Sequence, residues 1–197
     1  MAFIQKTVYT EPTHDYHNYG CKIRGDVLHY VAEMERMIDD YICSHFCYNL
    51  KKRAELMEVI VATKYITYQA KVDILKFLLL KRKDVTKKEA NKIYEVLTHK
   101  IGVKRNMIAH CELDSSITSI NKWKKEPNTV YFTKYAYTKK TEPFGKNDFI
   151  EILNLTGAVK VYLMELKGKR LQRMIKRNKR RNPSWPAKQT KMKGYAI

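Results

Sequence analysis

The chain has 197 residues, which suits one domain with a substantial hydrophobic core and leaves little room for a second full domain. Its 39 Lys and Arg against 20 Asp and Glu give a formal net charge of +19, so we expect a polyanionic partner. The longest apolar run, residues 77–80, is far shorter than a bilayer requires, which argues against a membrane protein.

The N-terminal part of the chain predicts an irregular leader followed by three helices. Residues 1–25 mix aromatic, His, Pro and Gly residues without helical spacing, so we expect them to be irregular. Asp26 is a plausible N-cap for a helix to about residue 48, in which apolar residues recur at helical spacing. Two more helices are predicted over roughly 51–62 and 67–82.

A capping box predicts the start of a fourth helix. The sequence "TKKE" at 86–89 places a Glu three residues after a Thr, so the two side chains can satisfy free backbone N–H groups at a helix start. The helix continues along an apolar stripe, with Gly102 as a possible break or kink. The stripe consists of Ile93, Leu97, Ile101 and Ile108.

The pattern changes after this helix. The sequences "ITSINKW" and "TVYFTKYAY", between residues 117 and 137, indicate two short β runs around a turn that contains Pro and Asn. Asn147 is the expected N-cap of a last helix through about Leu166. We therefore predict an all-α fold over residues 26–166, with a β-hairpin or β-rich insertion over about 115–140 before the last helix.

The positive charge is concentrated near the C-terminal end. Residues 167–197 contain 12 Lys and Arg and no Asp or Glu, which leaves 27 basic against 20 acidic residues, or +7, in residues 1–166. We interpret this segment as a basic tail that is helical at first and then disordered. A solvated tail, or one that touches anionic membranes, is an alternative, but nucleic acid is the partner that we favour.

Four cysteines occur, and the first residues lack the long apolar core of a signal peptide, so we expect reduced thiols in a cytoplasmic protein. A metal site built from Cys43, His45 and Cys47 is disfavoured, because on a helix His45 falls opposite the two cysteines. The chain has no Gly-rich phosphate loop. We predict neither a metal nor a cofactor.

The fourth helix ends in "RNMIAH", residues 105–110. Asn106 and His110 lie one turn apart on the same face, almost opposite the apolar stripe. Arg105 lies about 140° around an ideal helix from His110, a gap that its long side chain can bridge. On spacing alone, an equal alternative is that His110 is a surface histidine at a helix end and Arg105 a solvated arginine.

The stretch "KRNMIAHCE" resembles the Arg-x4-6-His motif of the HEPN superfamily, the higher eukaryotes and prokaryotes nucleotide-binding domains, with Arg105, Asn106 and His110 at the motif positions. The stretches "VLHYVAEMERMIDDYICSHF" and "TYQAKVDILKFLL" are also similar to early helices of HEPN proteins from bacterial defence and toxin systems. The resemblance covers about residues 26–166 and implies an antiparallel helix bundle. It also implies a metal-independent ribonuclease that works as a homodimer, with these three motif residues as the catalytic residues.

The chemistry of the motif residues agrees with RNA cleavage. The 2′-OH of RNA is its own nucleophile, so an enzyme must remove its proton, protonate the leaving 5′-oxygen and supply positive charge for the phosphate. Imidazole can serve in either proton transfer at neutral pH, and guanidinium donates to phosphate oxygens. One chain supplies a single motif histidine, so we expect a two-fold dimer whose interface includes Val103 and Met107 beside His110.

Two classes of function remain open. One is an RNA endonuclease of antiviral defence or of a toxin–antitoxin system, with an antitoxin or defence protein as a possible partner. The other is a non-catalytic HEPN module that binds nucleic acid or a protein. Glu112 stands where some HEPN toxins controlled by a nucleotidyltransferase antitoxin carry Tyr, so that mode of control is not expected. Glu35, Asp39 and Asp40 could orient the motif side chains, although charged helix residues are more often solvated.

Overall fold

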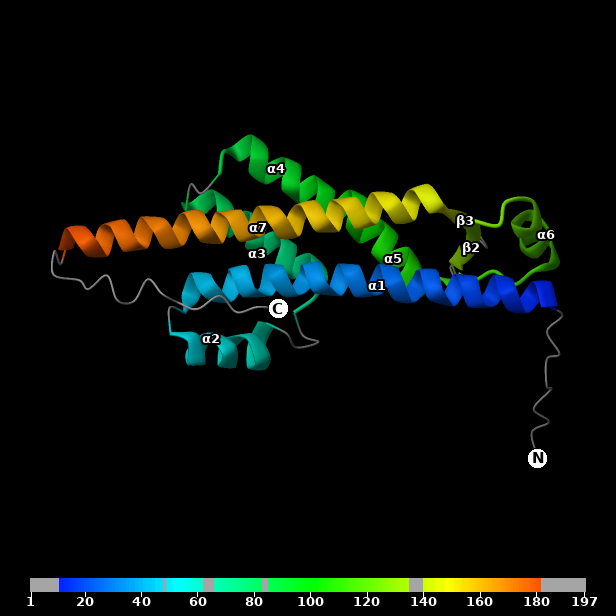
Figure 1. Cartoon of the computed structure of the whole chain (residues 1–197), viewed down its shortest axis with the longest axis horizontal. Helices are drawn as coiled ribbons and strands as arrows, with labels where there is room; N and C mark the ends of the chain where they lie inside the picture. Colours follow the sequence, from blue (N-terminus) through cyan, green and yellow to red (C-terminus); the bar gives the residue numbers. More distant parts are fainter. Residues whose placement is uncertain (1–10, 48, 62–65, 83–84, 135–139, 182–197) are drawn as a thin grey trace, which may run out of the picture.

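Two long helices form the framework of the molecule (Figure 1). They are α1 (Glu11–Phe46) and α7 (Lys146–Arg181), which lie side by side and run in the same direction. The structure is a computed structural model that describes residues 11–47, 49–61, 66–82, 85–134 and 140–181.

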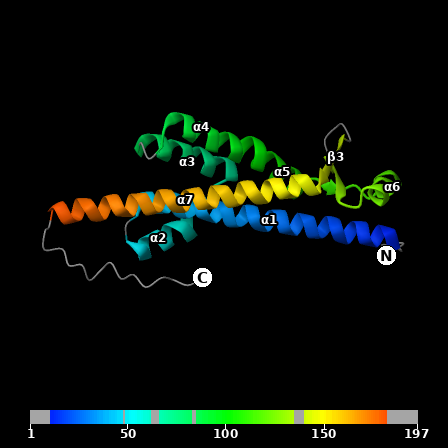
Figure 2. The ribbon, with the colours of Figure 1, turned by 45° about the horizontal axis from the view of Figure 1, so that its top comes forward.

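Shorter helices pack on both sides of this pair. α3 (Tyr68–Arg82) and α4 (Lys87–Glu95) lie on one side, and α2 (Leu50–Leu56) lies on the other, as two views show (Figures 1 and 2). α2 continues into the π-helical turn η1 (Met57–Val61). α4 continues through the π-helical turn η2 (Val96–Gly102) into α5, and this helix runs opposite to α1 and α7 (Figure 1).

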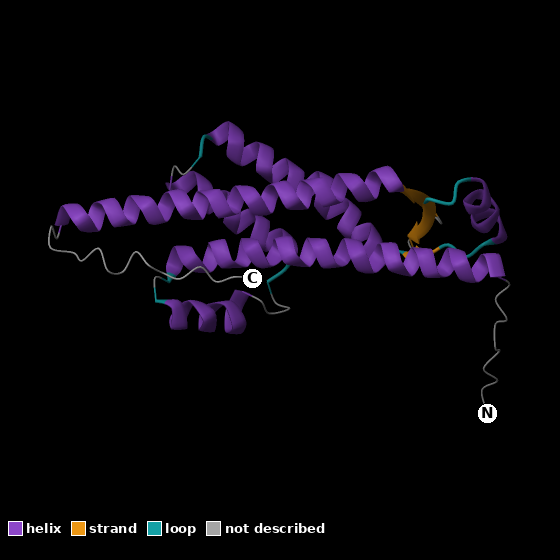
Figure 3. Cartoon of the chain, in the orientation of Figure 1, coloured by secondary structure: helices purple, strands orange, loops and turns teal. Residues whose placement is uncertain are grey.

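A small antiparallel sheet precedes α7. β1 (Glu112–Leu113), β2 (Thr129–Lys134) and β3 (Lys140–Gly145) lie in that order in the sheet. The sheet and α6 (Ile117–Lys125) lie at the end of the bundle where α1 and α7 both begin (Figure 3). The prediction of an all-α fold with a β insertion before the last helix is therefore confirmed.

The first helix differs from the prediction. α1 already begins at Glu11, so residues 11–25 are helical rather than an irregular leader, and residues 1–10 lie outside the described part of the chain. The reason is tertiary packing, which local sequence does not reveal. Tyr16 is fully buried, and a Cβ on Gly20 would meet the side chain of Leu113 at 2.6 Å. The contact with the sheet holds this segment helical.

The capping box is confirmed at the start of α4. The Thr86 side chain accepts a hydrogen bond from the backbone N–H of Glu89, and the Glu89 carboxylate accepts one from the backbone N–H of Thr86. The bonds that this carboxylate accepts from the backbone and the side chain of Thr86 hold the pKa of Glu89 below its usual value. Here a local signal was sufficient to predict the helix start.

The insertion is only partly β. The stretch "ITSINKW" was expected to be a strand, but it forms α6, so that prediction is wrong. Ser116 caps α6 by accepting from the backbone N–H of Ser119, and Ile120 is the buried apolar residue while Ile117 is exposed. The N-cap therefore outweighs the weak β preference of these residues. β2 is a strand as expected, whereas the end of "TVYFTKYAY" falls on residues 135–139, outside the described part.

The last helix begins at Lys146, close to the predicted Asn147. At this helix start, the side chain of Asp148 binds a free backbone N–H group, because its Oδ2 accepts from the N–H of Gly145 at 2.9 Å. The helix continues well past Leu166 to Arg181, into the basic segment, and residues 182–197 lie outside the described part.

One hydrophobic cluster joins α1, α3, α4, η2, α5, α6, α7 and the sheet. None of the helices in the described ranges combines the length and the apolar character that crossing a membrane would demand. The largest fully buried side chains are Tyr16, Tyr41, Phe132, Phe144, Met34, Ile38, Leu75, Leu78, Leu79, Leu97, Ile101 and Ile108.

Candidate functional site

The motif residues lie on α5 (Val103–His110), directly after the π-helical turn η2. Gly102 does not break the helix, because its backbone is helical, with φ −60° and ψ −43°. A Cβ there would approach the Leu97 carbonyl oxygen to 3.0 Å and Cε1 of Tyr68 to 3.3 Å. The Tyr68 hydroxyl donates to the same Leu97 carbonyl oxygen at 2.9 Å. A buried tyrosine therefore packs into the space that the glycine leaves, beside the wide turn of the helix.

Arg105 and His110 meet on the surface of α5. The Arg105 guanidinium reaches around the helix, and its Nη1 lies 3.5 Å from Nε2 of His110. The same Nη1 donates to Oδ1 of Asn106 at 3.0 Å. Asn106 and His110 are exposed and Arg105 is half-buried. The structure thus brings together the three residues that the motif predicted, and Asn106 contacts the guanidinium rather than the imidazole ring.

The aromatic ring of Tyr68 lies next to the guanidinium of Arg105. The Cζ atom of Arg105 lies 6.0 Å from the centre of the Tyr68 ring, at the outer limit of a cation–π contact. Burial, reinforced by the nearby carboxylate of Glu35, raises the pKa of the Tyr68 hydroxyl far above its usual value. Tyr68 is therefore neutral at physiological pH and acts as a packing surface and a hydrogen-bond donor to Leu97. Tyr68 lies in the helix predicted over 67–82, but no sequence signal connects it with Arg105.

The end of α5 is held by a residue of α1 that sequence analysis missed. Nη2 of Arg24 donates to the backbone carbonyl oxygen of Cys111 at 2.6 Å, and its Cζ lies 5.3 Å from the centre of the Phe132 ring. Helix ends carry free carbonyl groups, which cations stabilise. Arg24 lies in the segment that was predicted to be irregular, so no sequence signal linked it to the motif.

A groove opens beside the motif, between α5 and the sheet. Its volume is about 570 Å³, which falls in the range of small-ligand sites. It is lined by Val103, Asn106, Met107, His110, Cys111, Phe132, Lys134 and Glu142. A smaller hollow of about 210 Å³ adjoins it across Val103 and Asn106 and includes Tyr68 and Arg105 in its lining. The motif residues thus lie between two hollows of the surface.

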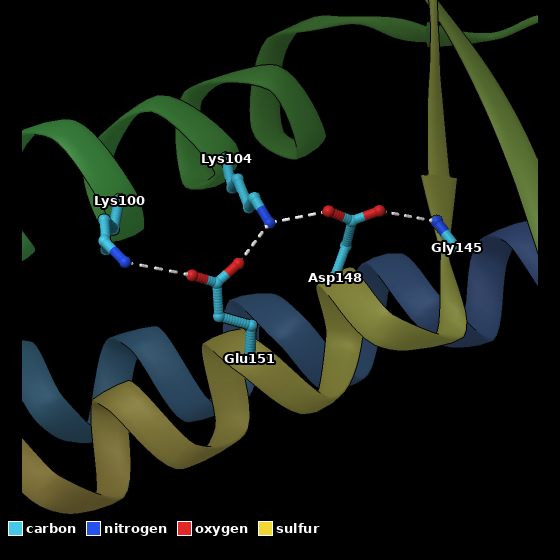
Figure 4. A network of polar contacts seen from close by, with 5 residues as sticks. All are labelled: Lys100, Lys104, Gly145, Asp148 and Glu151. Carbon is cyan, nitrogen blue, oxygen red and sulfur yellow. Dashed lines mark hydrogen bonds and ion pairs between the residues drawn. The ribbon is translucent and has the colours of Figure 1, made fainter.

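α5 is anchored to α7 by an ionic network next to the motif (Figure 4). Nζ of Lys104 donates to Oδ1 of Asp148 at 2.6 Å and to Oε2 of Glu151 at 2.8 Å, and Lys100 lies 3.4 Å from the other oxygen of Glu151. Burial opposes the charge of Asp148, but the bonds from Lys104 and Gly145 hold the pKa of that carboxyl below its usual value. The network ties the motif helix, the end of β3 and the start of α7 together.

The acidic residues of α1 bind other partners. Nζ of buried Lys71 donates to Glu35 at 2.7 Å and to Asp39 at 2.9 Å. Although burial opposes the charge of Lys71, these two bonds raise its pKa. Asp40 binds Arg53 and Lys167. The contacts of these carboxylates are therefore structural ion pairs with Lys71, Arg53 and Lys167.

The cysteine and histidine residues of α1 form no metal cluster in the described part of the chain. Cys43 is buried, and burial raises the pKa of its thiol to about 11, so it stays protonated at physiological pH. His45 accepts a hydrogen bond from Nε of Arg82 at 3.2 Å, if its Nε2 is unprotonated. Cys111 is also buried, beside the exposed His110.

The end of α7 exposes a basic surface. Within residues 167–181, Lys167 and Arg170 turn toward α1, where Lys167 binds Asp40 and Arg170 donates to Ser44 at 3.4 Å. Among the side chains of this part of the helix whose exposure the structure describes, the exposed basic ones are Lys169, Arg173, Lys176, Arg177 and Arg180. The first part of the basic segment is therefore part of the bundle as well as a charged surface.

Comparisons of the chain with protein-family models, with curated proteins and with solved structures found no match.

Proposed function

We propose that the protein is a metal-independent RNA endonuclease of HEPN type that cleaves by attack of the 2′-OH, with a composite site at a homodimer interface. The observation that carries the proposal is the cluster on α5. An exposed imidazole lies 3.5 Å from a guanidinium, which a neighbouring amide holds in place at 3.0 Å. This arrangement offers a proton-transfer group and a phosphate-binding fork at one point of the surface.

In this mechanism Arg105 binds the non-bridging oxygens of the scissile phosphate, where charge grows as the phosphate becomes pentacoordinate. His110 transfers a proton, either from the 2′-OH or to the leaving 5′-oxygen. The bond from the 2′-oxygen to phosphorus forms, the bond from phosphorus to the 5′-oxygen breaks, and the products carry a 2′,3′-cyclic phosphate and a 5′-OH. Asn106 keeps the guanidinium pointed toward His110.

A second copy of the chain supplies the second proton-transfer group. The groove beside His110 contains no other histidine among the residues that the structure describes. Val103 is 57% exposed and adjoins Asn106 and Met107 in the lining of that groove, so α5 offers apolar surface around His110. A two-fold contact between two α5 helices covers this surface and brings two His110 side chains toward the same phosphate.

The net charge and the end of α7 support a nucleic-acid substrate. The formal charge is +19, and exposed basic residues follow one another along α7 from Lys169 to Arg180. Such a surface binds phosphates without sequence preference and adds affinity outside the site. A role in antiviral defence or in a toxin–antitoxin system follows from the HEPN resemblance, and it belongs to this proposal.

The test is cleavage of RNA by purified protein in EDTA, compared with His110→Ala and with His99→Ala as a matched control. His99 is exposed on η2, in the same continuous helix, and does not line the groove. We expect wild type and His99→Ala to cleave RNA but not DNA, and His110→Ala and Arg105→Ala to lose about 10²–10⁴-fold in rate. RNA binding by a dimeric wild type without cleavage would instead indicate a non-catalytic HEPN binding module.

A further inference from the structure

The last helix, α7, carries a second apolar face that points away from the bundle. Eight positions of this face repeat at alternating spacings of four and three residues, which is the heptad spacing of a coiled coil. The face lies almost opposite the core, because Val161 is about 160° around an ideal helix from the buried Val159 and Leu163. We call it the outer seam, and it consists of Ile150, Asn154, Gly157, Val161, Met164, Gly168, Leu171 and Ile175.

The outer seam is uncharged and open to solvent. Val161 and Leu171 are each 56% exposed, Met164 is 50% exposed and Ile150 is 40% exposed. None of the eight positions holds Lys, Arg, Asp or Glu, although α7 is otherwise rich in them. Single exposed apolar residues are ordinary on a protein surface, whereas a continuous stripe of them marks an interaction site.

The length of the outer seam suits a coiled coil. From Ile150 to Ile175 it extends about 39 Å at 1.5 Å per residue. This length corresponds to between three and four heptads, the point at which a heptad pattern indicates a coiled coil rather than an ordinary amphipathic helix.

Two glycines of the outer seam have no role in the packing of the protomer. Gly157 and Gly168 lie inside α7, where Gly is less favourable than Ala. A Cβ on either residue would meet no atom of the described part of the chain within 4 Å. Glycine at such positions allows a second backbone to approach closely. The glycines therefore favour another helix as the occupant of this face.

The heptad positions favour two parallel strands. In parallel dimers, β-branched residues prefer position a, Leu prefers position d, and a single Asn at position a sets the register. Val161 and Ile175 occupy a positions, and Leu171 occupies a d position. Asn154 is the polar a position. In a parallel pair in register, each seam residue meets the same residue of the other copy, so the two asparagines can bind each other and the glycines bring the backbones together.

The charges beside the outer seam agree with this arrangement. Lys160 at position g and the exposed Glu165 at position e are five residues apart, the spacing of ion pairs between parallel strands. Lys160 already donates to Glu33 at 2.7 Å, but an ammonium group has three donors. It can therefore keep this bond and also bind Glu165 of a second copy, just as Lys71 and Lys104 each bind two carboxylates.

We propose that the outer seam binds the outer seam of a second copy of the chain as a parallel two-stranded coiled coil. This contact goes beyond the proposed function, because it does not overlap the contact between two α5 helices. α7 binds Lys104 of α5 through Asp148, which lies about 160° around the helix from Ile150. When both contacts form, the assembly is larger than a dimer, and it is a tetramer where the two axes are perpendicular.

The basic surface of α7 does not prevent parallel pairing. Lys169 and Arg173 each lie two residues from Leu171, about 160° around the helix. In the pair, the basic surfaces of the two copies are therefore separated by the width of both helices, about 20 Å. This separation exceeds the Debye length of about 8 Å at physiological ionic strength, so their repulsion is largely screened.

The test is the mass of the full-length protein in light scattering at micromolar concentration. We expect Val161→Glu combined with Leu171→Glu to lower the wild-type mass by at least half, because the pairing would bury four carboxylates. The control combines Leu50→Glu with Val59→Glu, which places the same charge at exposed apolar positions of α2 and η1 and should keep the wild-type mass. Thermal unfolding verifies that both variants are folded. An unchanged mass in the seam variant overturns the proposal.

The orientation is tested by a disulfide between copies. Leu171→Cys is made in a Cys21→Ser background, because Cys21 is the exposed cysteine of the chain. In a parallel pair the two introduced thiols face each other, so oxidation should yield a covalent dimer. Arg173→Cys in the same background is the control and should remain monomeric on a denaturing gel, because position 173 lies on the opposite side of α7. Absence of the disulfide in Leu171→Cys overturns parallel pairing.

RNA cleavage separates this proposal from the proposed function. We expect the seam variant, Val161→Glu with Leu171→Glu, to cleave RNA as wild type does, because the α5 contact remains. Cleavage with an unchanged mass in the seam variant overturns the α7 contact and leaves the nuclease standing. A mass that depends on the seam, without cleavage by wild type, rejects the nuclease and supports the α7 contact. Pairing through the seam that occurs only after residues 182–197 are removed would assign this face to that segment and overturn the proposal.

Discussion

Nη2 of Arg24 donates a hydrogen bond to the backbone carbonyl oxygen of Cys111 at 2.6 Å, across 87 residues of sequence. The bond joins the first helix to the residue that directly follows His110. It therefore fixes the point where the motif helix ends and the sheet begins, which is also the edge of the groove. The position of the candidate catalytic histidine thus depends on a residue of α1.

Replacement of Arg24 by Ala should loosen the end of α5. We expect the free energy of unfolding to fall by about 1.5–3 kcal/mol, the usual range for a hydrogen bond to a charged group. Amide hydrogen exchange in residues 107–113 should accelerate, and RNA cleavage should slow. Arg36→Ala, which removes an exposed arginine from the same helix, is the matched control and should leave both readouts near wild type. Unchanged exchange in Arg24→Ala would mean that the Cys111 carbonyl needs no support.

Tyr16 should stabilise the junction of α1 and the sheet in the same way. Its hydroxyl donates to the carbonyl oxygen of Asp114 at 3.0 Å and accepts from the backbone N–H of Tyr131 at 3.1 Å. Burial raises the pKa of Tyr16 to about 12, so the hydroxyl stays protonated at physiological pH. Tyr16→Phe leaves two backbone groups without this partner, and we expect a loss of about 1–3 kcal/mol in urea unfolding. Tyr30→Phe, at a partly exposed position of α1, should cost less than half as much.

These contacts show which parts of the structure local sequence can predict. The start of α4 was predictable because Thr86 and Glu89 stabilise it within one turn. The clustering of Arg105, Asn106 and His110 was also predictable, since helix geometry and side-chain length bring them together. The helical state of residues 11–25 was not, because it depends on contacts of Tyr16 with residues about 100 positions away.

The residues that the sheet contributes to the groove could not be predicted from the sequence, for the same reason. The pairing of Phe132 with Glu142 sets which side chains face α5, and that register cannot be derived from an imperfect alternation of residues. Tyr68 likewise meets Arg105 through the packing of α3 on η2, which spacing along one helix does not encode. The motif could therefore be recognised in the sequence, whereas the residues that position it could not.

Gly102 offers a direct test of the π-helical turn. A Cβ would lie 3.0 Å from the Leu97 carbonyl oxygen and 3.3 Å from Tyr68, so Gly102→Ala should displace Tyr68 from beneath Arg105. We expect a loss of about 1–3 kcal/mol in thermal or urea unfolding, typical of overpacking, together with reduced RNA cleavage. Gly25→Ala is the control, because nothing lies within 4 Å of its Cβ and a helical Gly→Ala change should stabilise by about 0.5–1 kcal/mol. Equal gains in both variants would exclude a steric role for Gly102.

The Lys104 network predicts a specific response to acid. Bonds from Lys104 lower the pKa of Asp148 against the effect of burial, and they lower the pKa of Glu151 directly. A carboxylate with a lowered pKa in the folded state adds stability above its ordinary pKa, here 3.8 and 4.5, and loses it as the pH falls through the folded-state pKa. Lys104→Met should therefore lower the stability at pH 7 and make the decline below about pH 4.5 shallower, as urea titrations at a series of pH values will show. If the stability of Lys104→Met declines with falling pH as steeply as that of wild type, the ion pairs of Lys104 do not cause the acid response.

The basic surface of α7 should determine affinity and leave the chemistry of cleavage unchanged. Deleting the whole basic segment would also remove the contacts of Lys167 and Arg170 with α1. A change in RNA binding or cleavage could then come from a disturbed bundle rather than from lost surface charge. Replacing exposed Lys176, Arg177 and Arg180 by Gln avoids this problem.

We expect the triple variant to bind RNA more weakly. The slope of the logarithm of the binding constant against the logarithm of the salt concentration should be shallower by about 0.7 for each phosphate that the variant no longer neutralises. The cleavage rate under saturating RNA should not change. The control replaces three exposed lysines elsewhere, Lys22, Lys51 and Lys52, by Gln and changes the net charge equally. The same fall in affinity in both variants would show that total charge, rather than the α7 surface, attracts the RNA. A slower rate at saturation in the α7 variant alone would instead place this surface within reach of the reacting phosphate.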